Sequence, residues 1–579
     1  MIDNSAFFET LYRKHAILST ASLILSVIGP LVCTVLIGNM YGANGLAAVA
    51  VCSPLFFLGA FLGMTLSGGG NVLVSRSVAR REDEEASRVY SASWILGICG
   101  GAGVCVLLLI LEAPILSFLP SEMRADVSGY YRWVSLTVIL TVLQWIPLNF
   151  CRFAGRPNIG PIMTGTMAVS SVAFAFLFMP SMGLSGAAFA QALGCLCSLV
   201  AAIVLMRGSL LQFRFTKRLG MREIFSYGSP FGLERLYAMV GAYVMNTVFH
   251  MSGACTALAV YGVFQIIHRF MTALISGSAQ TIIPIAGMLN AERDVTSLGK
   301  FLKHATLYGN AVLAVACLLL FVFRDFVSAL FGLTDAADAD LFRYAVVFYT
   351  IYVMLLLNTT LFAAWFNASA RLRLANLLFL QDLIFLCLSA ALLAVFCGGR
   401  APWAAFPIAG VLSASALAMI LVGMRRRNAR LIYPFLLDPS AVRAGRDLTF
   451  SVRNDPAEAS EASARISAFC ESSGLTKKQT ILIALSVEEF ITLILNNNDR
   501  TEVLDLTCRL TLGEDEIAIR IRNRGRMFDP VAYYKENIAN DIERGVEIIG
   551  LKYIAENARA IDYRETFGVN NLLIAIGRH

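Results

Sequence analysis

Four ionisable side chains lie inside long apolar stretches of the chain. Glu234 and Asp382 are carboxylates in two of these stretches, and His268 and Arg269 are neighbours in a third. An ionisable residue at membrane depth is costly and is therefore a functional candidate by default. A carboxylate in such a place can exchange a proton or a sodium ion as its surroundings alternate between dry and hydrated. We therefore predict that Glu234 and Asp382 bind and release a coupling ion, H⁺ or Na⁺.

Each of these residues also has a structural interpretation. Glu234 and the neighbouring Arg235 are equally suited to cap a helix near the membrane surface. Asp382 is equally suited to pair with Arg269, or with a polar neighbour, as a contact between helices. His268 fits an interhelical hydrogen bond better than a proton relay.

Several amide side chains lie in the same kind of apolar segment. An amide that faced lipid would lack hydrogen-bond partners. We therefore expect these residues, together with His268 and Arg269, to face a common cavity. The amides are Gln144, Asn149, Asn246, Gln265, Gln280 and Asn358.

Long charge-free segments hold these side chains. From Ala16 to Ser75 the chain has no Lys, Arg, Asp or Glu, whereas a helix crosses the hydrocarbon core of a bilayer in about 20 apolar residues. The pattern predicts an all-α polytopic membrane part with twelve transmembrane helices. They are 16–39, 45–70, 89–115, 129–151, 159–180, 184–206, 226–250, 254–285, 304–331, 343–367, 374–397 and 401–424.

Charge is distributed unevenly over the connecting loops. Loops on one side of the predicted helices carry 22 Lys and Arg, and loops on the other side carry 5. The positive-inside rule then places both termini in the cytoplasm, as in a multi-pass protein of a bacterial plasma membrane. The net charge of +7 suits a membrane protein and does not indicate a nucleic-acid partner. No Cys or His spacing predicts a bound metal or a disulfide framework.

The two halves of the membrane part resemble each other. Residues 33–51 align with residues 244–262, with Gly42 opposite Gly253. Two parallel six-helix lobes around a central cavity are a transporter architecture. The predicted domains are a first lobe at 1–215, a second lobe at 216–428, a basic linker at 429–445 and a cytoplasmic domain at 446–579.

Several short motifs in this order resemble the MATE family of multidrug and toxic-compound exporters. They are Gly42-x-x-x-Leu-Ala-Ala-Val49, the polar loop 76–88, Phe153-Ala-Gly-Arg-Pro157, Gly183-Leu-Ser-Gly-Ala-Ala188, Ser229-Pro-Phe-Gly-Leu-Glu234, Asn246 with Gly253, and Gln280, Pro284 and Asn290. The resemblance implies an ion-coupled antiporter that exports small organic compounds, cationic or amphipathic, by alternating access. One departure is that Cys33 stands where these proteins commonly have an acidic residue in the first helix.

Two other functions remain open from the sequence. Lipid-linked oligosaccharide flippases belong to the same wider group, so a flippase of a lipid-linked substrate is one alternative. The absence of a first-lobe carboxylate also allows a membrane sensor that no longer transports and signals through its tail. The expected partners are membrane lipids, a small organic substrate and a cytoplasmic protein that binds the tail.

The tail from Arg443 onward has 21 acidic and 18 basic residues, which is typical of a water-exposed domain. A helix is expected after Asp455-Pro456 and a second one after Thr476. Two alternating segments, VLDLTCRLTL and EIAIRIRN, predict an antiparallel hairpin. A last helix near 544–558 and two further strands complete an α/β sandwich.

This order of elements resembles the GHKL ATPase fold, in particular its serine-kinase-like anti-sigma type. Its nucleotide boxes are eroded: Glu488 is followed by Thr492 where the family has a magnesium-binding Asn. The next box reads Asn523-Arg-Gly525-Arg-Met527-Phe-Asp529-Pro, and the last reads Arg544-Gly545-Val-Glu547-Ile-Ile-Gly550. Met527 replaces a Gly that turns freely, and Glu547 would repel phosphate. We therefore predict a domain that keeps the fold without kinase chemistry, is not an enzyme, and either binds ATP or ADP weakly or docks a partner.

Overall fold

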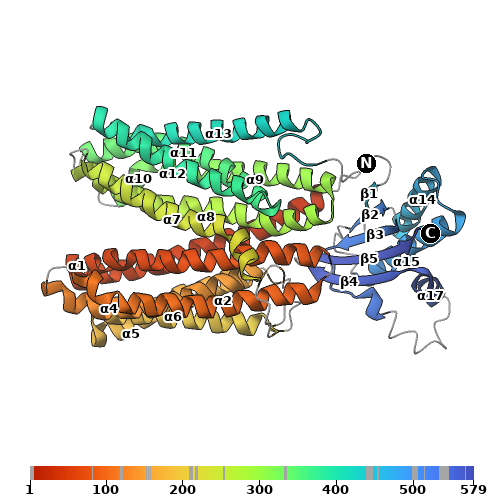
Figure 1. Ribbon diagram of the computed structural model, residues 1–579, viewed down its shortest axis with the longest axis horizontal. Helices are drawn as coiled ribbons and strands as arrows, with labels where there is room; N and C mark the ends of the chain where they lie inside the picture. Colours follow the sequence, from red (N-terminus) through yellow and green to blue (C-terminus); the bar gives the residue numbers. More distant parts are fainter. Residues whose placement is uncertain are drawn as a thin grey trace.

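The computed structural model consists of a helical part, Ser5 to Arg427, and a C-terminal α/β part, Asp447 to Gly577 (Figure 1). It describes residues 5–578 apart from 81, 118–120, 152, 154–155, 157, 208–212, 215–219, 252–254, 331–335, 398–399, 439–446, 453–455, 499–505, 514, 534–546 and 567–568. Long apolar helices lie side by side in the helical part, and the α/β part caps one end of them. We call this end the docking end.

Each lobe contains a matching series of helices. Those of the first lobe are α1 Ser5–Ala79, α2 Asp83–Ile110, α3 Glu112–Ser117, α4 Ser121–Phe150, α5 Ile159–Met182 and α6 Leu184–Leu205. Those of the second lobe are α7 Met221–Met251, α8 Cys255–Ala291, α9 Val295–Val322, α10 Arg324–Leu330, α11 Ala336–Ala368, α12 Leu372–Phe396, the short η1 Ala401–Ala404 and α13 Ala405–Arg427. Helices α2 and α9 have 28 residues each. Both are followed by a short helix, which supports the internal repeat.

Helix α1 is continuous from Ser5 to Ala79, but the chain reverses direction within it. Thr20 touches Gly277 and Ser75 touches Gly287. These two glycines are separated along α8 by about 15 Å, whereas a straight helix would separate Thr20 from Ser75 by about 80 Å. The run therefore forms two antiparallel spans, Phe7–Ile37 and Leu55–Val78. The predicted pair 16–39 and 45–70 is confirmed, although the connection between them is assigned as helix.

Among the described residues, twelve helical stretches are long and apolar enough to cross a membrane. Eleven of these coincide with predicted spans, and the twelfth, Lys477–Asn496, is a helix of the α/β part. Helix α7 carries Glu234 and Arg235 and does not meet the same criterion, yet it packs alongside α1 and α12. When the two spans of α1 are counted separately and α7 is included, the described helical part contains the twelve membrane helices that the sequence predicts. The predicted helices 89–115 and 304–331 are each interrupted, at Leu111 and Phe323.

The outer surface of the helical part is apolar. Val395 and Phe396 on α12 have 71% and 79% of their surface exposed, and Met419 on α13 has 68%. Side chains of this kind at this density suit contact with lipid tails rather than with water. The chain is therefore a multi-pass membrane protein.

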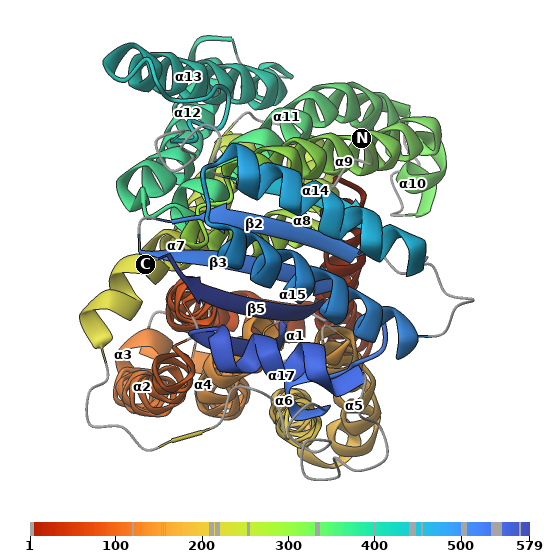
Figure 2. The same cartoon turned by 90° about the vertical axis from the view of Figure 1, so that its right-hand side faces the viewer.

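The C-terminal part is a five-stranded antiparallel sheet with the strand order β1-β2-β3-β5-β4. Its strands are β1 Asp447–Val452, β2 Leu506–Leu512, β3 Glu516–Asn523, β4 Ala560–Thr566 and β5 Val569–Gly577. Its helices are α14 Pro456–Ser472, α15 Lys477–Asn496 and α17 Glu547–Asn557, and all three cover the same face of the sheet (Figure 2). The predicted hairpin is confirmed as β2 and β3.

Side-chain alternation explains this layering. Cys508 and Leu510 of β2 and Ile519 and Ile521 of β3 are fully buried in one cluster with the apolar residues of α15. The predicted start of α15 at Thr476 is confirmed by a capping box with Gln479. Asp455, the other predicted cap, lies outside the described residues.

Residues 428–438, the described part of the predicted linker with its flank, pack onto the second lobe. The indole of Trp365 donates to the carbonyl oxygen of Phe435 at 2.8 Å, and Arg371 donates to that of Leu436 at 3.0 Å. Leu436 is fully buried. This segment therefore extends the second lobe and does not act as a free spacer.

Candidate functional site

Asp382 is at the centre of a polar network inside the second lobe. The hydroxyl of Tyr352 on α11 donates to its Oδ2 at 2.8 Å, and the hydroxyl of Ser413 on α13 donates to its Oδ1 at 3.2 Å. The carboxylate thus joins α11, α12 and α13 through hydroxyl groups. Among the described residues no ion pair links it to Arg269, so a polar neighbour is its partner, as the second structural interpretation predicts.

His268 belongs to an adjoining contact. Its Nδ1 lies 2.9 Å from the hydroxyl of Tyr349, which is one turn from Tyr352 on α11. The rings of Tyr349 and Tyr352 both pack against Phe406, with centroids 5.9 Å and 5.5 Å away. The interhelical hydrogen bond expected for His268 is therefore present. Tyr349, Tyr352 and Ser413 were not among the predicted site residues, although two tyrosines three residues apart in an apolar helix could have indicated a polar face.

Glu234 lies at the boundary between the lobes. Its Oε1 is 3.7 Å from Arg235 Nη2, and both side chains are about one quarter exposed. Arg235 also points its Nε at the sulfur of Met64 in the first lobe, at 3.0 Å. The pair lies well inside α7, so the alternative of a helix cap is wrong. Gly241, about 10 Å further along α7, contacts Leu383, so Glu234 and Asp382 lie at different depths.

The predicted amides do not form one cluster. Gln265 donates to Asn246 at 2.9 Å, joining α8 to α7. Asn358 exchanges hydrogen bonds with Asn310 at 3.0 Å, joining α11 to α9.

In the first lobe, Asn149 donates to Ser67 at 2.9 Å and Gln144 donates to the carbonyl oxygen of Cys195 at 3.3 Å. Five of the six amides therefore hydrogen-bond to another helix of their own lobe, but only Asn246 and Gln265 bond to each other. A shared cavity for Gln144, Asn149 and Asn358 stays a prediction.

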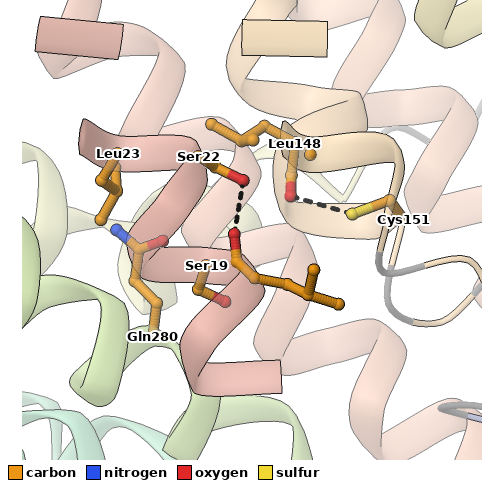
Figure 3. A pocket seen from close by; sticks show the side chains of 8 residues that line it. Ser19, Ser22, Leu23, Leu148, Cys151 and Gln280 are labelled. Atoms are coloured by element: carbon orange, nitrogen blue, oxygen red, sulfur yellow. Dashed lines mark hydrogen bonds between the residues drawn. The ribbon is translucent and has the colours of Figure 1, made fainter. Parts of the chain in front are cut away.

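Gln280 lies at a small pocket between the lobes. The pocket has an empty volume of about 290 Å³ and is lined by Leu18, Ser19, Ser22, Leu23, Leu148, Cys151, Gly160 and Gln280. Figure 3 shows the Gln280 side chain of α8 beside Ser19 and Leu23 of α1. The Oγ of Ser19 lies 3.3 Å from the Oγ1 of Thr281, the residue after Gln280. The pocket is thus a polar gap in the contact between α1 and α8.

Arg269 is the exposed charge of this region. It lies on α8 one turn from Gln265, whose partner Asn246 is also exposed. Exposed polar groups in the middle of apolar helices cannot all face lipid, because they would lack partners there. Asn246, Gln265 and Arg269 therefore form a polar strip on the surface of the second lobe.

The lobes touch most closely toward the docking end. A Cβ added to Gly228 on α7 would lie 1.8 Å from the carbonyl oxygen of Thr65, and one on Gly69 would lie 1.9 Å from that of Ile224. Only glycine permits such an approach of two backbones. The gap between the lobes is therefore closed at this end.

In the C-terminal part, the described residues of the nucleotide boxes are hydrogen-bonded within the domain. Asn523 Oδ1 accepts from Asn570 at 2.8 Å and from the backbone of Gly525 at 3.2 Å. Asp529 caps the next turn, accepting from Val531 at 2.9 Å.

Glu488 accepts from Ser460 at 3.2 Å. Thr492 lies one turn further along α15 and is partly buried, and Gly550 lies in α17. Gly545 is outside the described residues. Nucleotide binding by these residues therefore stays a prediction.

Comparison with known proteins identifies the fold of the helical part. The MatE family model matches residues 19–177. A MATE crystal structure in complex with MaL6 is 19% identical and has a TM-score of 0.67, covering 73% of this chain and 97% of that chain.

Two further structures give similar agreement. The Vibrio cholerae MATE transporter VcmN in its bent form is 15% identical, with a TM-score of 0.67 and coverage of 74% and 99%. A MOP superfamily transporter from Pyrococcus furiosus, for which reverse polarity of the binding pocket suggests a different function, is 19% identical, with a TM-score of 0.66 and coverage of 73% and 96%. No curated protein matches the chain. The helical part thus has the MATE fold.

Proposed function

We propose that this protein is a secondary-active antiporter that exports small organic, cationic or amphipathic compounds by alternating access. The carrying observation is the pair of matching lobes, which meet backbone to backbone at one end, together with the exposed polar groups on α7 and α8 of the second lobe. Rocking two such lobes exposes a midplane site to each side in turn. In this proposal the docking end is cytoplasmic, the membrane is the plasma membrane of a bacterium, and the tail is regulatory.

Asp382 is our first choice for the residue that binds H⁺ or Na⁺. Both of its oxygens accept from hydroxyl groups, and neither forms an ion pair with a described residue, so the carboxylate keeps the capacity to bind a cation. Glu234 is our second choice, because Arg235 at 3.7 Å already balances its charge. Tyr352 and Ser413 can hold the Asp382 side chain in place both with and without a bound ion.

Efflux of a fluorescent cation from proteoliposomes under an imposed proton or sodium gradient tests this assignment. We expect Asp382→Asn to abolish ion-driven efflux, because an amide cannot bind the ion, and Glu234→Gln to reduce it less. Asp340→Asn is the matched control, since Asp340 forms an exposed ion pair with Arg400 at 2.7 Å. If wild type transports and neither Asp382→Asn nor Glu234→Gln changes the flux, the coupling assignment is wrong.

One observation favours a second candidate, a flippase of a lipid-linked substrate. Arg269 is an exposed cation on the polar strip of the second lobe and would attract a phosphate group. Scrambling of a fluorescent phospholipid or of a polyprenyl phosphate in the same proteoliposomes separates the two candidates. Arg269→Gln should lower lipid flipping if this candidate is correct, and should leave the efflux of cations intact.

For the tail we propose a GHKL-like fold that docks a partner and has no kinase activity. The support is that Asn523, the first residue of the second nucleotide box, uses its side-chain oxygen inside the domain. Calorimetry on the full chain with ATP and magnesium tests this. Heat release that is saturable and is lost in Asn523→Ala would instead establish a nucleotide site.

A further inference from the structure

The face of the sheet that is not covered by helices carries arginines. Arg509 on β2 is directly opposite Arg520 on β3, and Arg522 follows two residues later on the same face. Like charges directly opposite each other destabilise a sheet unless they share a counter-charge. This arginine-rich face points toward the membrane helices (Figure 2), so the helical part supplies the counter-charge.

The second lobe supplies it from the connection between α8 and α9. Glu292 Oε1 is 2.6 Å from Arg520 Nη1, and its Oε2 bonds to Arg522. Asp294 Oδ2 lies 3.4 Å from Arg509 and 3.8 Å from Arg522.

The side chain of Glu292 is only 1% exposed and that of Asp294 only 4%. We call the five residues Arg509, Arg520, Arg522, Glu292 and Asp294 the anchor.

The backbone of the α8–α9 connection is shaped for this contact. Arg293 has a φ of 55°, which turns the chain sharply between the two helices. Its carbonyl oxygen accepts from Arg509 at 3.3 Å, and Asp294 caps α9 by accepting from Ser297 at 3.1 Å. Glu292 and Asp294 are therefore held in place before the sheet binds.

The first lobe meets the C-terminal part at two places. The start of α1 lies beside the anchor, with Arg522 5.7 Å from the ring of Phe8 and Arg524 5.9 Å from that of Phe7, and it packs on the second lobe through Tyr12 and Phe301.

The other contact is an ion pair at the start of α2. Arg564 on β4 bonds to Asp83, the first residue of α2, and also to Asp562 at 3.1 Å. The side chain of Asp83 is 43% exposed. We call the pair of Asp83 and Arg564 the latch.

The anchor and the latch occupy matching positions in the internal repeat. Asp83 begins α2 and Asp294 immediately precedes α9, the corresponding 28-residue helix of the second lobe. The offset between the two aspartates is the same as that between Gly42 and Gly253. One rigid sheet therefore binds the same loop of both lobes, at the end where the lobes are closed.

We propose that the C-terminal part is an intramolecular clamp that keeps the docking end of the two lobes closed, and that it opens at the latch while the anchor stays bound. The inference rests on the alternating access proposed above, because the lobes must separate at the docking end when the cavity opens to that side. It adds which contact of the sheet breaks and which stays bound.

The order follows from burial. Opening the anchor would break the ion pairs that two nearly buried carboxylates, Glu292 and Asp294, form with Arg509, Arg520 and Arg522, although Arg509 would keep Asp447 at 2.9 Å. Opening the latch breaks the pair of Asp83 and Arg564, whose carboxylate already contacts water, and such pairs contribute little. The sheet therefore stays on the second lobe and leaves the first.

Hydrogen exchange of the full chain in lipid nanodiscs tests the clamp without requiring transport. The peptides that report closure are 61–72 and 224–235, which contain the glycine contact between the lobes. We expect Asp83→Asn to accelerate exchange there by roughly fivefold, which is the scale of losing one half-exposed ion pair. Exchange in β2 and β3 should remain as in wild type.

Two further variants make the result specific. The charge swap Asp83→Arg with Arg564→Asp should restore the wild-type exchange rate at 61–72. Arg465→Gln removes an exposed ion pair with Glu461, 2.6 Å long, on α14 and should have no effect.

Three results would overturn the clamp or part of it. Unchanged exchange at 61–72 in Asp83→Asn would refute the clamp. Faster exchange in β2 and β3 together with 61–72 would show that the whole sheet leaves, which refutes the assigned order. A failed charge swap would refute the role of the pair. Accelerated exchange in a protein that moves no solute would support the clamp and refute the exporter.

Discussion

The two lobes repeat one series of helices but differ in where they carry charge. The second lobe holds Asp382 with its two hydroxyl partners, and Glu234 with Arg235 at the lobe boundary. In the first lobe, Glu112 lies at the start of α3, just beyond α2, and pairs with Arg132 at 2.9 Å. Packing of the apolar faces therefore defines the repeated scaffold, while a few polar residues in one copy define its chemistry.

The same asymmetry recurs where the C-terminal part docks. The second lobe contributes two buried carboxylates and the first lobe contributes one half-exposed carboxylate. In the proposed clamp the second lobe is therefore the fixed partner of the sheet, and the first lobe is the one that moves away. Three further variants or conditions test this difference between the lobes.

The largest effect is expected at the glycine contact between the lobes, where their backbones lie closest. Gly228→Val would drive a side chain into the carbonyl group of Thr65 and should destabilise the closed state by about 3 kcal/mol. Thermal unfolding in detergent measures this loss as a lower Tm. Gly423→Ala on α13 is the matched control, since a Cβ there meets nothing within 4 Å. Equal Tm values for both variants would contradict the close contact.

A slightly smaller effect is expected at the anchor. Glu292→Gln removes the charge that Arg520 and Arg522 share and should cost about 3 kcal/mol or less, because the amide retains one hydrogen bond. Asp83→Asn at the latch should cost no more than about 1 kcal/mol. Calorimetric unfolding of the two variants compares the lobes directly, and a larger loss for Asp83→Asn would reverse the assigned order.

The smallest effect is expected from mild acid. Burial tends to raise the pKa of Glu292, but Arg520, Arg522 and Arg509 together outweigh it and hold the pKa below its ordinary value of 4.5. A lowered pKa contributes stability above the ordinary value, and that contribution is lost as the pH falls through the lowered one. Docking should therefore be unchanged between pH 7 and about pH 5.5 and weaken only below the ordinary value. Calorimetry at these pH values, with Glu292→Gln as the control that lacks this titration, checks the sign.

Local pattern was sufficient for the elements of the C-terminal part. The alternation around Cys508 and Ile519 predicted two paired strands, and the polar residues before α15 predicted its start at Thr476. The alternating pattern did not predict what the arginines between those apolar residues would contact. Arg509 and Arg522 lie on the other face of the hairpin, and the structure buries both.

Apolar length and repeated spacing are properties of the chain alone, and they were sufficient to predict the twelve membrane helices and the internal repeat. Which polar groups meet depends on how distant segments pack against each other. Asp382 meets Tyr352 and not Arg269, and Glu292 meets Arg520 across more than two hundred residues. The physical reason is that a buried charge is stable only beside specific partners, and those partners are chosen by how helices and sheet pack in space.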